Sequence, residues 1–255
     1  MNRRLFLIAS LLCFNTALAA PAKPMRVLFV GNSYTYANGM PHIVAALAKA
    51  AKGRSLEFEM VTKGGFTFQR HFEQQDKKSA RARIRDGKWD FVVLQEQSQM
   101  PVMYPKVTID WGTRLAKEVK AAGATPVFFM TWARQHIPDQ QEKLNAVYSQ
   151  LAKDSEGKLA PVGLAWQSAF KLDSKRVLHN KDKSHPNKSG SYLAACVIYS
   201  TLYDKSLQRL PGTLIATVKG KRGVLIKIPT SEAVKLQKIA WETVSKSKSK
   251  SKVKQ

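Results

Sequence analysis

The sequence is poor in cysteine, in acidic side chains and in long apolar runs. It has two cysteines, Cys13 and Cys196, and Cys13 lies in an N-terminal segment that we expect to be removed. One remaining thiol excludes an intramolecular disulfide, so the fold must depend on its core. Cys196 lies in an apolar run and is predicted to be a small buried side chain rather than a nucleophile. After the N-terminal segment, no run approaches the roughly eighteen apolar residues that a spanning helix needs.

The scarcity of acidic residues leaves a strongly basic chain. Eighteen Asp and Glu face 42 Lys and Arg, and the formal net charge is +24. Such a charge favours polyanions, but no basic motif interleaved with aromatics and no nucleic-acid fold signature accompanies it. We therefore expect no specific nucleic-acid partner. Electrostatic contact with an anionic cell envelope, and a monomeric state, are the expectations.

The two ends of the chain differ in composition from the rest. Residues 1–20 combine Arg3 and Arg4, an apolar stretch and the small-residue sequence Ala17-Leu18-Ala19, which is typical of a signal peptide. We expect an exported protein, periplasmic or secreted. Residues 21–244 are predicted to form a single domain, and the Ser/Lys-rich residues 245–255 a disordered tail.

Strands and helices alternate between these ends. Short β-branched and aromatic runs predict strands at 27–30, 56–62, 89–94, 126–130 and 159–162. Helices are predicted at 40–52, 69–85, 106–122, 138–156, 165–172, 188–202 and 231–244, with an irregular loop at 100–105 and a hairpin at 214–228. The alternation indicates an α/β fold, a three-layer sandwich with a mostly parallel five-stranded sheet. The first four strands all end in polar turns, which therefore share one edge of the sheet.

The first of these turns, Gly31-Asn32-Ser33-Tyr34-Thr35, displays a hydroxyl. Such a turn is most often structural, but Ser33 becomes a candidate nucleophile if a base can take its proton. His185 is the candidate base, because Asp182 three residues earlier could hold one ring nitrogen while the other faces the serine. The remaining four histidines are interpreted as surface or packing residues.

A metal site is an alternative for the same loop. His179, Asp182 and His185 have the spacing His-x-x-Asp-x-x-His. Lys181, Lys183 and Pro186 make the segment a basic loop, where neighbouring cations oppose a metal. We therefore expect no metal ligands and no cofactor.

The motifs and their order resemble those of the SGNH, or GDSL-like, hydrolase superfamily. Gly31-Asn32-Ser33 is similar to its first block, Gly65-Phe66-Thr67 to its second, and Asp182 with His185 to its Asp-x-x-His block. The resemblance implies a flavodoxin-like fold and a serine esterase that works through Ser33, His185 and Asp182, with the Gly65 N–H in the oxyanion hole.

The third block departs from that pattern. The superfamily has Gly-x-Asn-Asp after the third strand, and this chain has Gln95-Glu96-Gln97-Ser98. A glutamine amide can donate the same N–H through one more methylene, so Gln95 and Gln97 are both candidates. Gln95 is preferred because some carbohydrate-esterase branches are similar in having a glutamine at this strand end. A polar strand terminus that merely caps the sheet is the alternative.

The substrate is the least constrained part of the interpretation. Tyr34, Tyr104 and Trp132 are predicted to line the pocket, although they could equally pack the loops. We expect a small-molecule or glycan ester, first an acetylated carbohydrate and second another short-chain acyl ester. The alternative function is a non-catalytic glycan- or polyanion-binding protein on the same fold.

Overall fold

The computed structural model describes residues 22–252, so the predicted signal peptide lies outside the described residues. Its centre is a five-stranded sheet in which every neighbouring pair of strands is parallel. The order across the sheet is β2 (Leu56–Thr62), β1 (Met25–Gly31), β3 (Phe91–Leu94), β4 (Thr125–Phe129) and β5 (Lys158–Ala160). The predicted α/β fold with a five-stranded parallel sheet is confirmed.

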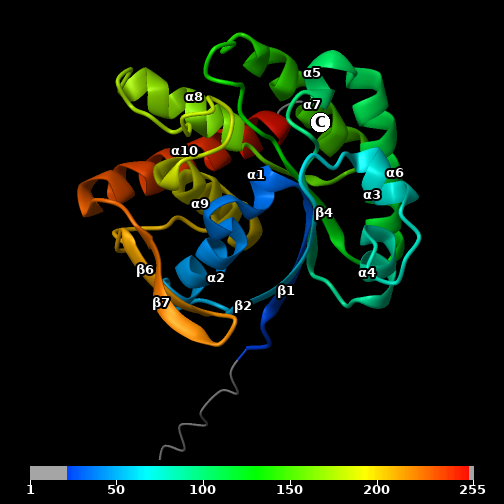
Figure 1. Ribbon diagram of the computed structural model, residues 1–255, viewed down its shortest axis with the longest axis horizontal. Coiled ribbons are helices and arrows are strands. Elements are labelled where there is room, and N and C mark those ends of the chain that lie inside the picture. The colour runs from blue at the N-terminus through cyan, green and yellow to red at the C-terminus, as the bar shows by residue number, and fades with distance from the viewer. Residues whose placement is uncertain (1–21, 253–255) are drawn as a thin grey trace, which may run out of the picture.

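The central strands are apolar on both sides because helices cover both faces of the sheet. In β1, Val27 and Phe29 enter one core and Leu28 and Val30 the other, as the two-residue period of a strand requires. Helices pack on both sides in Figure 1. One face carries α2 (Met40–Ala50), α8 (Val162–Leu172), α9 (Lys188–Tyr203) and α10 (Thr230–Lys252), and the other α3 (Phe68–Glu73), α4 (Ala80–Asp86), α6 (Pro105–Ala121) and α7 (Gln140–Asp154).

Helix α9 is the most buried helix of the fold. Every residue from Gly190 to Leu202 is buried, because α2, α8 and α10 surround the helix on the sheet. Cys196 lies within this stretch with no exposed surface, which confirms its predicted packing role. The helix begins after Asn187, whose side chain accepts a hydrogen bond from Gly190 N, so its start anchors the loop that precedes it.

Three predicted segments differ in detail. The single helix expected at 69–85 is wrong: α3 and α4 are separate, because Thr67 and Ser79 each cap a new helix start. The loop expected at 100–105 contains the short helix α5 (Met100–Met103), with Pro101 in its first turn. The hairpin consists of β6 (Thr213–Val218) and β7 (Lys221–Lys227), with a shorter turn than expected.

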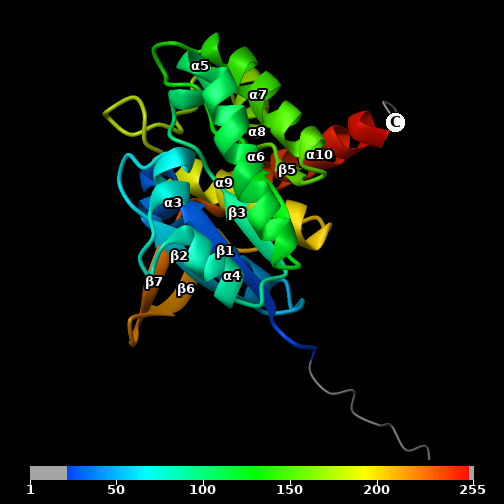
Figure 2. The ribbon, with the colours of Figure 1, turned by 90° about the vertical axis from the view of Figure 1, so that its right-hand side faces the viewer.

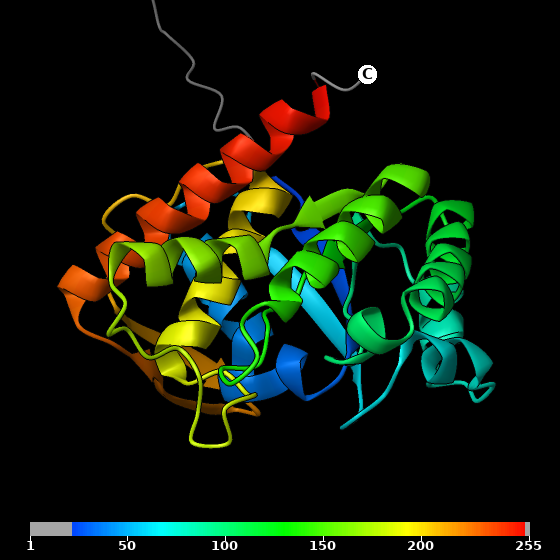
Figure 3. The same cartoon turned by 90° about the horizontal axis from the view of Figure 1, so that it is seen from above.

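The C-terminal segment is helical where a disordered tail is predicted. Helix α10 continues past Val244 to Lys252, and Figures 2 and 3 show it extending beyond the rest of the fold. Lysine and serine are acceptable in helices, and no Gly or Pro interrupts the segment, so the packed first part propagates outward. An ion pair between Lys248 and Asp204 holds this extension. Within residues 22–252, none of the helices has the length and hydropathy of a transmembrane span.

The carboxyl ends of the strands bring the polar turns together at one edge. Val30 pairs with Leu94, and Leu94 pairs with Phe128, so β1, β3 and β4 end at the same level. The segments that follow are 32–35, 95–98 and 131–134. This edge is where open parallel sheets bind their ligands.

Candidate active site

Ser33 lies at the first turn after the central strand. Strand β1 ends at Gly31, and Ser33 begins the short helix α1 (Ser33–Tyr36), which Asn32 caps by accepting a hydrogen bond from Tyr34 N at 3.1 Å. A Cβ on Gly31 would lie 2.4 Å from Thr35 Oγ1 and 2.6 Å from Gln95 Oε1. Glycine is therefore required here, since side chains from two directions close over its Cα.

The structure brings Ser33, His185 and Asp182 into one hydrogen-bonded chain. Ser33 Oγ lies 2.8 Å from His185 Nε2, and His185 Nδ1 lies 2.5 Å from Asp182 Oδ2. Serine and histidine are 152 positions apart in the sequence. In Figure 3 the loop before α9, coloured yellow-green, lies beside α1, coloured blue. This is the arrangement that a serine needs in order to lose its proton to an oriented imidazole.

The loop that carries His185 is held from within. Asp182 Oδ1 accepts hydrogen bonds from Ser184 N and His185 N, both at 3.0 Å. Burial would raise the pKa of Asp182, but these bonds and the one from the His185 ring outweigh it and lower the pKa below its ordinary value. The chain bends at Lys183, where φ is +61°. Asp182 therefore stays ionised and holds His185 through both its backbone N–H and its imidazole ring.

A stack of aromatic rings supports the loop from below. Tyr34 stacks on Trp132 with ring centroids 4.7 Å apart, and Trp132 stacks on Trp166 at 4.1 Å. Tyr34 Oη lies 2.6 Å from Ser184 Oγ, and Trp132 Nε1 donates to Ser184 O at 3.0 Å. Burial raises the pKa of Tyr34, so its hydroxyl remains protonated.

The predicted substrate-binding role of Tyr34 and Trp132 is therefore wrong. Their exposed fractions are 3% and 1%, and their polar atoms are used by the loop. They position His185 from behind because Trp166 completes the stack and closes them off from solvent. Tyr104, between α5 and α6, is 52% exposed and remains accessible to a ligand.

The prediction that Gln95 donates to an oxyanion is also wrong. Gln95 is fully buried, and its Oε1 accepts hydrogen bonds from Asn32 N at 2.9 Å and Thr35 Oγ1 at 2.8 Å. Its Nε2 donates to Glu96 O. Gln95 N still bonds to Val30 O, so the residue continues the β-ladder and its side chain turns inward over Gly31. Both ends of the amide stabilise the Ser33 turn.

Gln97 has a different position. Its Oε1 accepts hydrogen bonds from Gln99 N at 2.7 Å and Met100 N at 3.2 Å, which orients the amide. Gln97 and Gly65 line the same open hollow of about 520 Å³. Gly65 has φ of +70°, a conformation that favours glycine. The two candidate donors that remain therefore face one space.

Asn32 connects the Ser33 turn and the Gly65 turn. Its Nδ2 donates to Phe66 O at 3.0 Å, while its Oδ1 caps α1. An aspartate could cap the helix but could not donate to Phe66. Asparagine at this position thus links the Ser33 turn to the Gly65 turn.

Two buried titratable residues near the turns were not identified from the sequence. Glu96 is 1% exposed, and burial raises its pKa to about 7, opposed by hydrogen bonds from Gln97 N and Phe68 N. His71 is 1% exposed, and burial lowers its pKa to about 4, opposed by a hydrogen bond between its Nε2 and Gly31 O. The only signal in the sequence is proximity to the motifs.

His179 does not join His185 and Asp182 in a ligand cluster. Its Nε2 bonds to Ala133 O at 3.0 Å, and its ring packs against Trp166 and Phe170. In the part of the chain that the structure describes, no group of three His, Cys, Asp or Glu is arranged to hold a metal ion.

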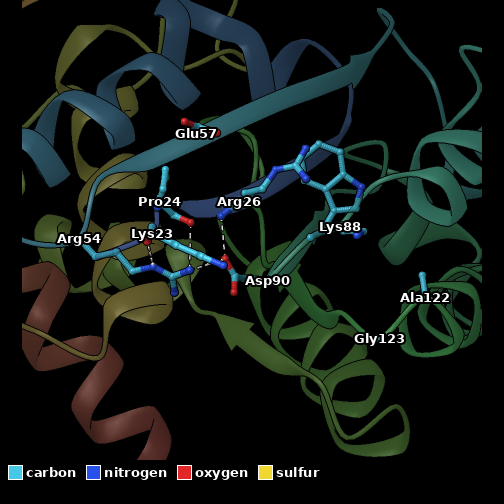
Figure 4. Close-up of a pocket in the computed structure, with 10 residues that line it drawn as sticks. Lys23, Pro24, Arg26, Arg54, Glu57, Lys88, Asp90, Ala122 and Gly123 are labelled. Carbon is cyan, nitrogen blue, oxygen red and sulfur yellow. Dashed lines mark hydrogen bonds and ion pairs between the residues drawn. The ribbon is translucent and has the colours of Figure 1, made fainter. Parts of the chain in front are cut away.

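A second, basic hollow of about 470 Å³ lies at the amino-terminal ends of β1 and β3, which is the edge opposite Ser33. Figure 4 shows the residues that line it. Arg54 donates to Lys23 O at 2.6 Å and to Pro24 O at 3.0 Å, and pairs with Asp90 at 2.9 Å. The Arg26 guanidinium lies 4.8 Å from the ring centre of Trp89, which is also part of the lining. Lys23 and Lys88 add further positive charge.

Comparisons with known proteins agree with the fold. No family model matches the sequence, and no curated protein matches it. A solved structure from Slackia heliotrinireducens, assigned to the SGNH hydrolases, is 30% identical, with a TM-score of 0.61 over 71% of this chain and 100% of that chain. This chain belongs to the SGNH hydrolase superfamily, and the resemblance inferred from its motifs is confirmed.

Two further structures share the fold at lower identity. A DUF4886 family protein from Bacteroides uniformis is 19% identical, with a TM-score of 0.61 over 87% of this chain and 95% of that chain. The esterase EstA from a Pseudoalteromonas species, in a structure inhibited by monoethylphosphonate, is 16% identical, with a TM-score of 0.54 over 70% of this chain and 97% of that chain.

Proposed function

We propose that the protein is an exported serine esterase that hydrolyses short-chain carboxylic esters through an acyl-enzyme. The observation that carries the proposal is the chain of two short hydrogen bonds from Ser33 Oγ through His185 to Asp182. The chemistry agrees with the hydrolase superfamily to which the chain belongs.

The first half of the reaction acylates Ser33. Its Oγ attacks the ester carbonyl carbon while His185 Nε2 takes the hydroxyl proton, and Asp182 stabilises the imidazolium through Nδ1–H. The tetrahedral oxyanion accepts hydrogen bonds from Ser33 N–H, Gly65 N–H and the Gln97 amide. Its collapse breaks the bond to the alcohol, which leaves with the proton from His185.

The second half releases the acid. Water attacks the acyl carbon as His185 Nε2 takes one of its protons, and the same oxyanion donors hold the new tetrahedral intermediate. Its collapse returns the proton to Ser33 Oγ and frees the carboxylic acid.

Acetylated carbohydrate is the proposed substrate class, and a simpler short-chain acyl ester is the second choice. The hollow beside the donors is lined by polar side chains, Gln69, Arg70 and Gln99 among them, together with the apolar Met100 and Met103. Such a mixture suits a leaving group that offers both hydroxyls and a C–H face. A screen of p-nitrophenyl esters of increasing acyl length, alongside acetylated oligosaccharides, tests both parts.

The decisive experiment compares Ser33→Ala with Ser168→Ala. Ser168 lies on α8, where its hydroxyl bonds to Leu164 O, so its loss controls for general effects of removing a serine. We expect Ser33→Ala to lose hydrolysis of p-nitrophenyl acetate and labelling by an organophosphonate, while Ser168→Ala keeps both. Undiminished hydrolysis by Ser33→Ala would refute the assignment.

The basic hollow favours a second role, contact with anionic polymers of the cell envelope. Lys23, Arg26 and Lys88 gather there at the edge opposite the proposed active site (Figure 4). We propose that this contact localises the esterase near its substrate. The test is binding to an acidic polysaccharide, which should weaken with added salt and should be weaker still in the double variant Lys23→Gln/Lys88→Gln. If Ser33→Ala binds the polysaccharide and the wild type hydrolyses no ester, the non-catalytic alternative is favoured.

A further inference from the structure

Glu96 is the buried carboxyl group that the proposed chemistry leaves unused. It lies two residues after the end of strand β3 and has 1% of its surface exposed, in a chain with 42 basic residues. A buried carboxylate is normally paired with a cation. Here its hydrogen-bond partners are backbone groups, since Oε1 accepts from Phe68 N at 3.0 Å and from Gln97 N at 2.6 Å.

The two N–H groups belong to the two segments that carry the proposed oxyanion donors. Phe68 begins α3 directly after the turn that contains Gly65. Gln97 supplies the side-chain amide. One carboxylate oxygen therefore ties the Gly65 turn to the Gln97 segment, across 28 positions of sequence.

Other contacts fix the same two segments at different points, so Glu96 controls their separation. Asn32 Nδ2 holds Phe66 O at 3.0 Å, on the side of Ser33. Gln99 N and Met100 N hold the Gln97 side chain through its Oε1. A hydrogen bond to a charged acceptor is about twice as strong as one to a neutral acceptor. Ionised Glu96 therefore holds the two segments more firmly than protonated Glu96.

We propose that Glu96 is a positioning residue that sets the spacing of the Gly65 and Gln97 oxyanion donors, and that turnover therefore depends on whether Glu96 is ionised. The proposal rests on the proposed esterase function. It adds to that function a form of regulation by pH, in which the site is loosened when the surroundings become acidic.

The environment of Glu96 allows it to titrate in the neutral range. Helix α7 presents Tyr148, whose hydroxyl accepts a hydrogen bond from Glu96 N at 3.3 Å and whose own pKa is raised by burial and by the Glu96 charge. Helix α3 presents the Phe68 N–H, and its His71 is turned to Gly31 O. Burial raises the pKa of Glu96 to about 7, against the opposing effect of its two backbone bonds.

The test is the pH profile of kcat/KM for wild type, Glu96→Gln, Glu96→Ala and the control Glu118→Gln. Glu118 pairs with Arg81 away from the turns. Near neutrality, kcat/KM should fall more steeply with decreasing pH in wild type and in Glu118→Gln than in Glu96→Gln, because protonation of Glu96 loosens the donors. Glu96→Gln keeps an acceptor but cannot ionise, so its slope should be smaller.

Separate measurements of kcat and KM distinguish a positioning role of Glu96 from a purely structural one. Glu96→Ala leaves two N–H groups without their acceptor and should lower kcat by about 10²-fold through misplaced donors, with little change in KM. Glu96→Gln keeps a neutral acceptor, as protonated Glu96 does, so its kcat at pH 8 should lie between those of Glu96→Ala and wild type. Equal slopes in wild type and Glu96→Gln, or a Glu96→Gln enzyme faster than wild type at every pH, would overturn the proposal, the latter because the charge would then hinder the oxyanion.

A second measurement is independent of catalysis. The amide proton shifts of Phe68 and Gln97, followed by NMR in the Ser33→Ala background, should titrate together near neutrality and should not titrate when Glu96→Gln is added. If hydrolysis fails to depend on Ser33 while these shifts titrate, the proposed function is wrong and the Glu96 contact is right. If the shifts do not titrate, the inference about Glu96 is wrong whatever the activity.

Discussion

Replacing Glu96 by glutamine should change how the stability of the fold depends on pH. Burial raises the pKa of Glu96 from 4.5 to about 7 in the folded protein. Below pH 4.5 the carboxyl is protonated in both folded and unfolded chains, so it does not affect their balance. As pH rises, the unfolded chain releases its proton first, and the folded state loses stability until pH passes 7.

The magnitude follows from the size of the shift. A difference of about 2.5 pKa units, at about 1.36 kcal/mol per unit, corresponds to about 3 kcal/mol of unfolding free energy lost between pH 4.5 and pH 7. This is a large part of the total stability of an ordinary domain, about 5–15 kcal/mol. Glu96→Gln accepts the same hydrogen bonds without the charge, so it should not show this loss.

Urea unfolding of wild type and Glu96→Gln between pH 4 and pH 8.5 measures the effect. Other titrating groups are common to both proteins and cancel in the difference between their free energies of unfolding. That difference should move by about 3 kcal/mol in favour of the variant as pH rises. A difference that stays constant with pH, or moves in favour of wild type, would show that Glu96 does not carry the buried charge assigned to it.

Four other substitutions test the neighbouring residues. His71, with its pKa lowered to about 4 by burial, has the opposite sign to Glu96: between pH 6.5 and pH 4 wild type should lose about 3 kcal/mol of stability relative to His71→Gln, measured by the same unfolding series. Gln97→Ala should lower kcat on the order of 10²–10³-fold, with Ser33 still labelled by a phosphonate. Gln95→Ala should mainly lower the unfolding midpoint, because it leaves buried donors without an acceptor at about 1–3 kcal/mol each. Equal losses of turnover in the two variants would contradict this distinction. Gly31→Ala places a Cβ 2.4 Å from Thr35 Oγ1 and should destabilise by about 1–3 kcal/mol with loss of activity, and an unchanged melting temperature would show that the turn can expand.

Local patterns were enough for the parts of the site that are close in sequence. Asp182 and His185 are three residues apart, so the loop alone brings carboxylate and imidazole within reach. The apolar β1 run followed by glycine indicates a buried strand and a turn. Parallel strands with aligned ends then place the turns at one edge, which is a consequence of topology that the alternation of helices and strands already predicts.

Local patterns could not predict which side chains at that edge face the hollow and which are buried. An extended segment directs Gln95 and Gln97 to the same side, so period alone treats them as equivalent. In the fold, β3 continues one residue through the bond from Gln95 N to Val30 O, and the chain turns afterwards. Gln95 is therefore drawn into the interior, whereas Gln97 remains at the hollow.

The aromatic residues show the same limit. Tyr34 and Trp132 follow polar strand ends, where a ring can either meet a ligand or pack beneath a loop. Trp166, from a helix later in the chain, stacks on Trp132, and Trp132 therefore packs beneath the loop. Burial of this kind depends on contacts between distant segments, which no local pattern contains.

The sequence by itself determined the superfamily and the parallel sheet, and it predicted which serine, histidine and aspartate would meet, because each depends on local periodicity or on motif order. Only the tertiary structure decided which glutamine faces the hollow, which rings support the histidine loop, and that Glu96 is buried between the two donor segments. Hydrogen-bond partners and burial are set where distant segments meet.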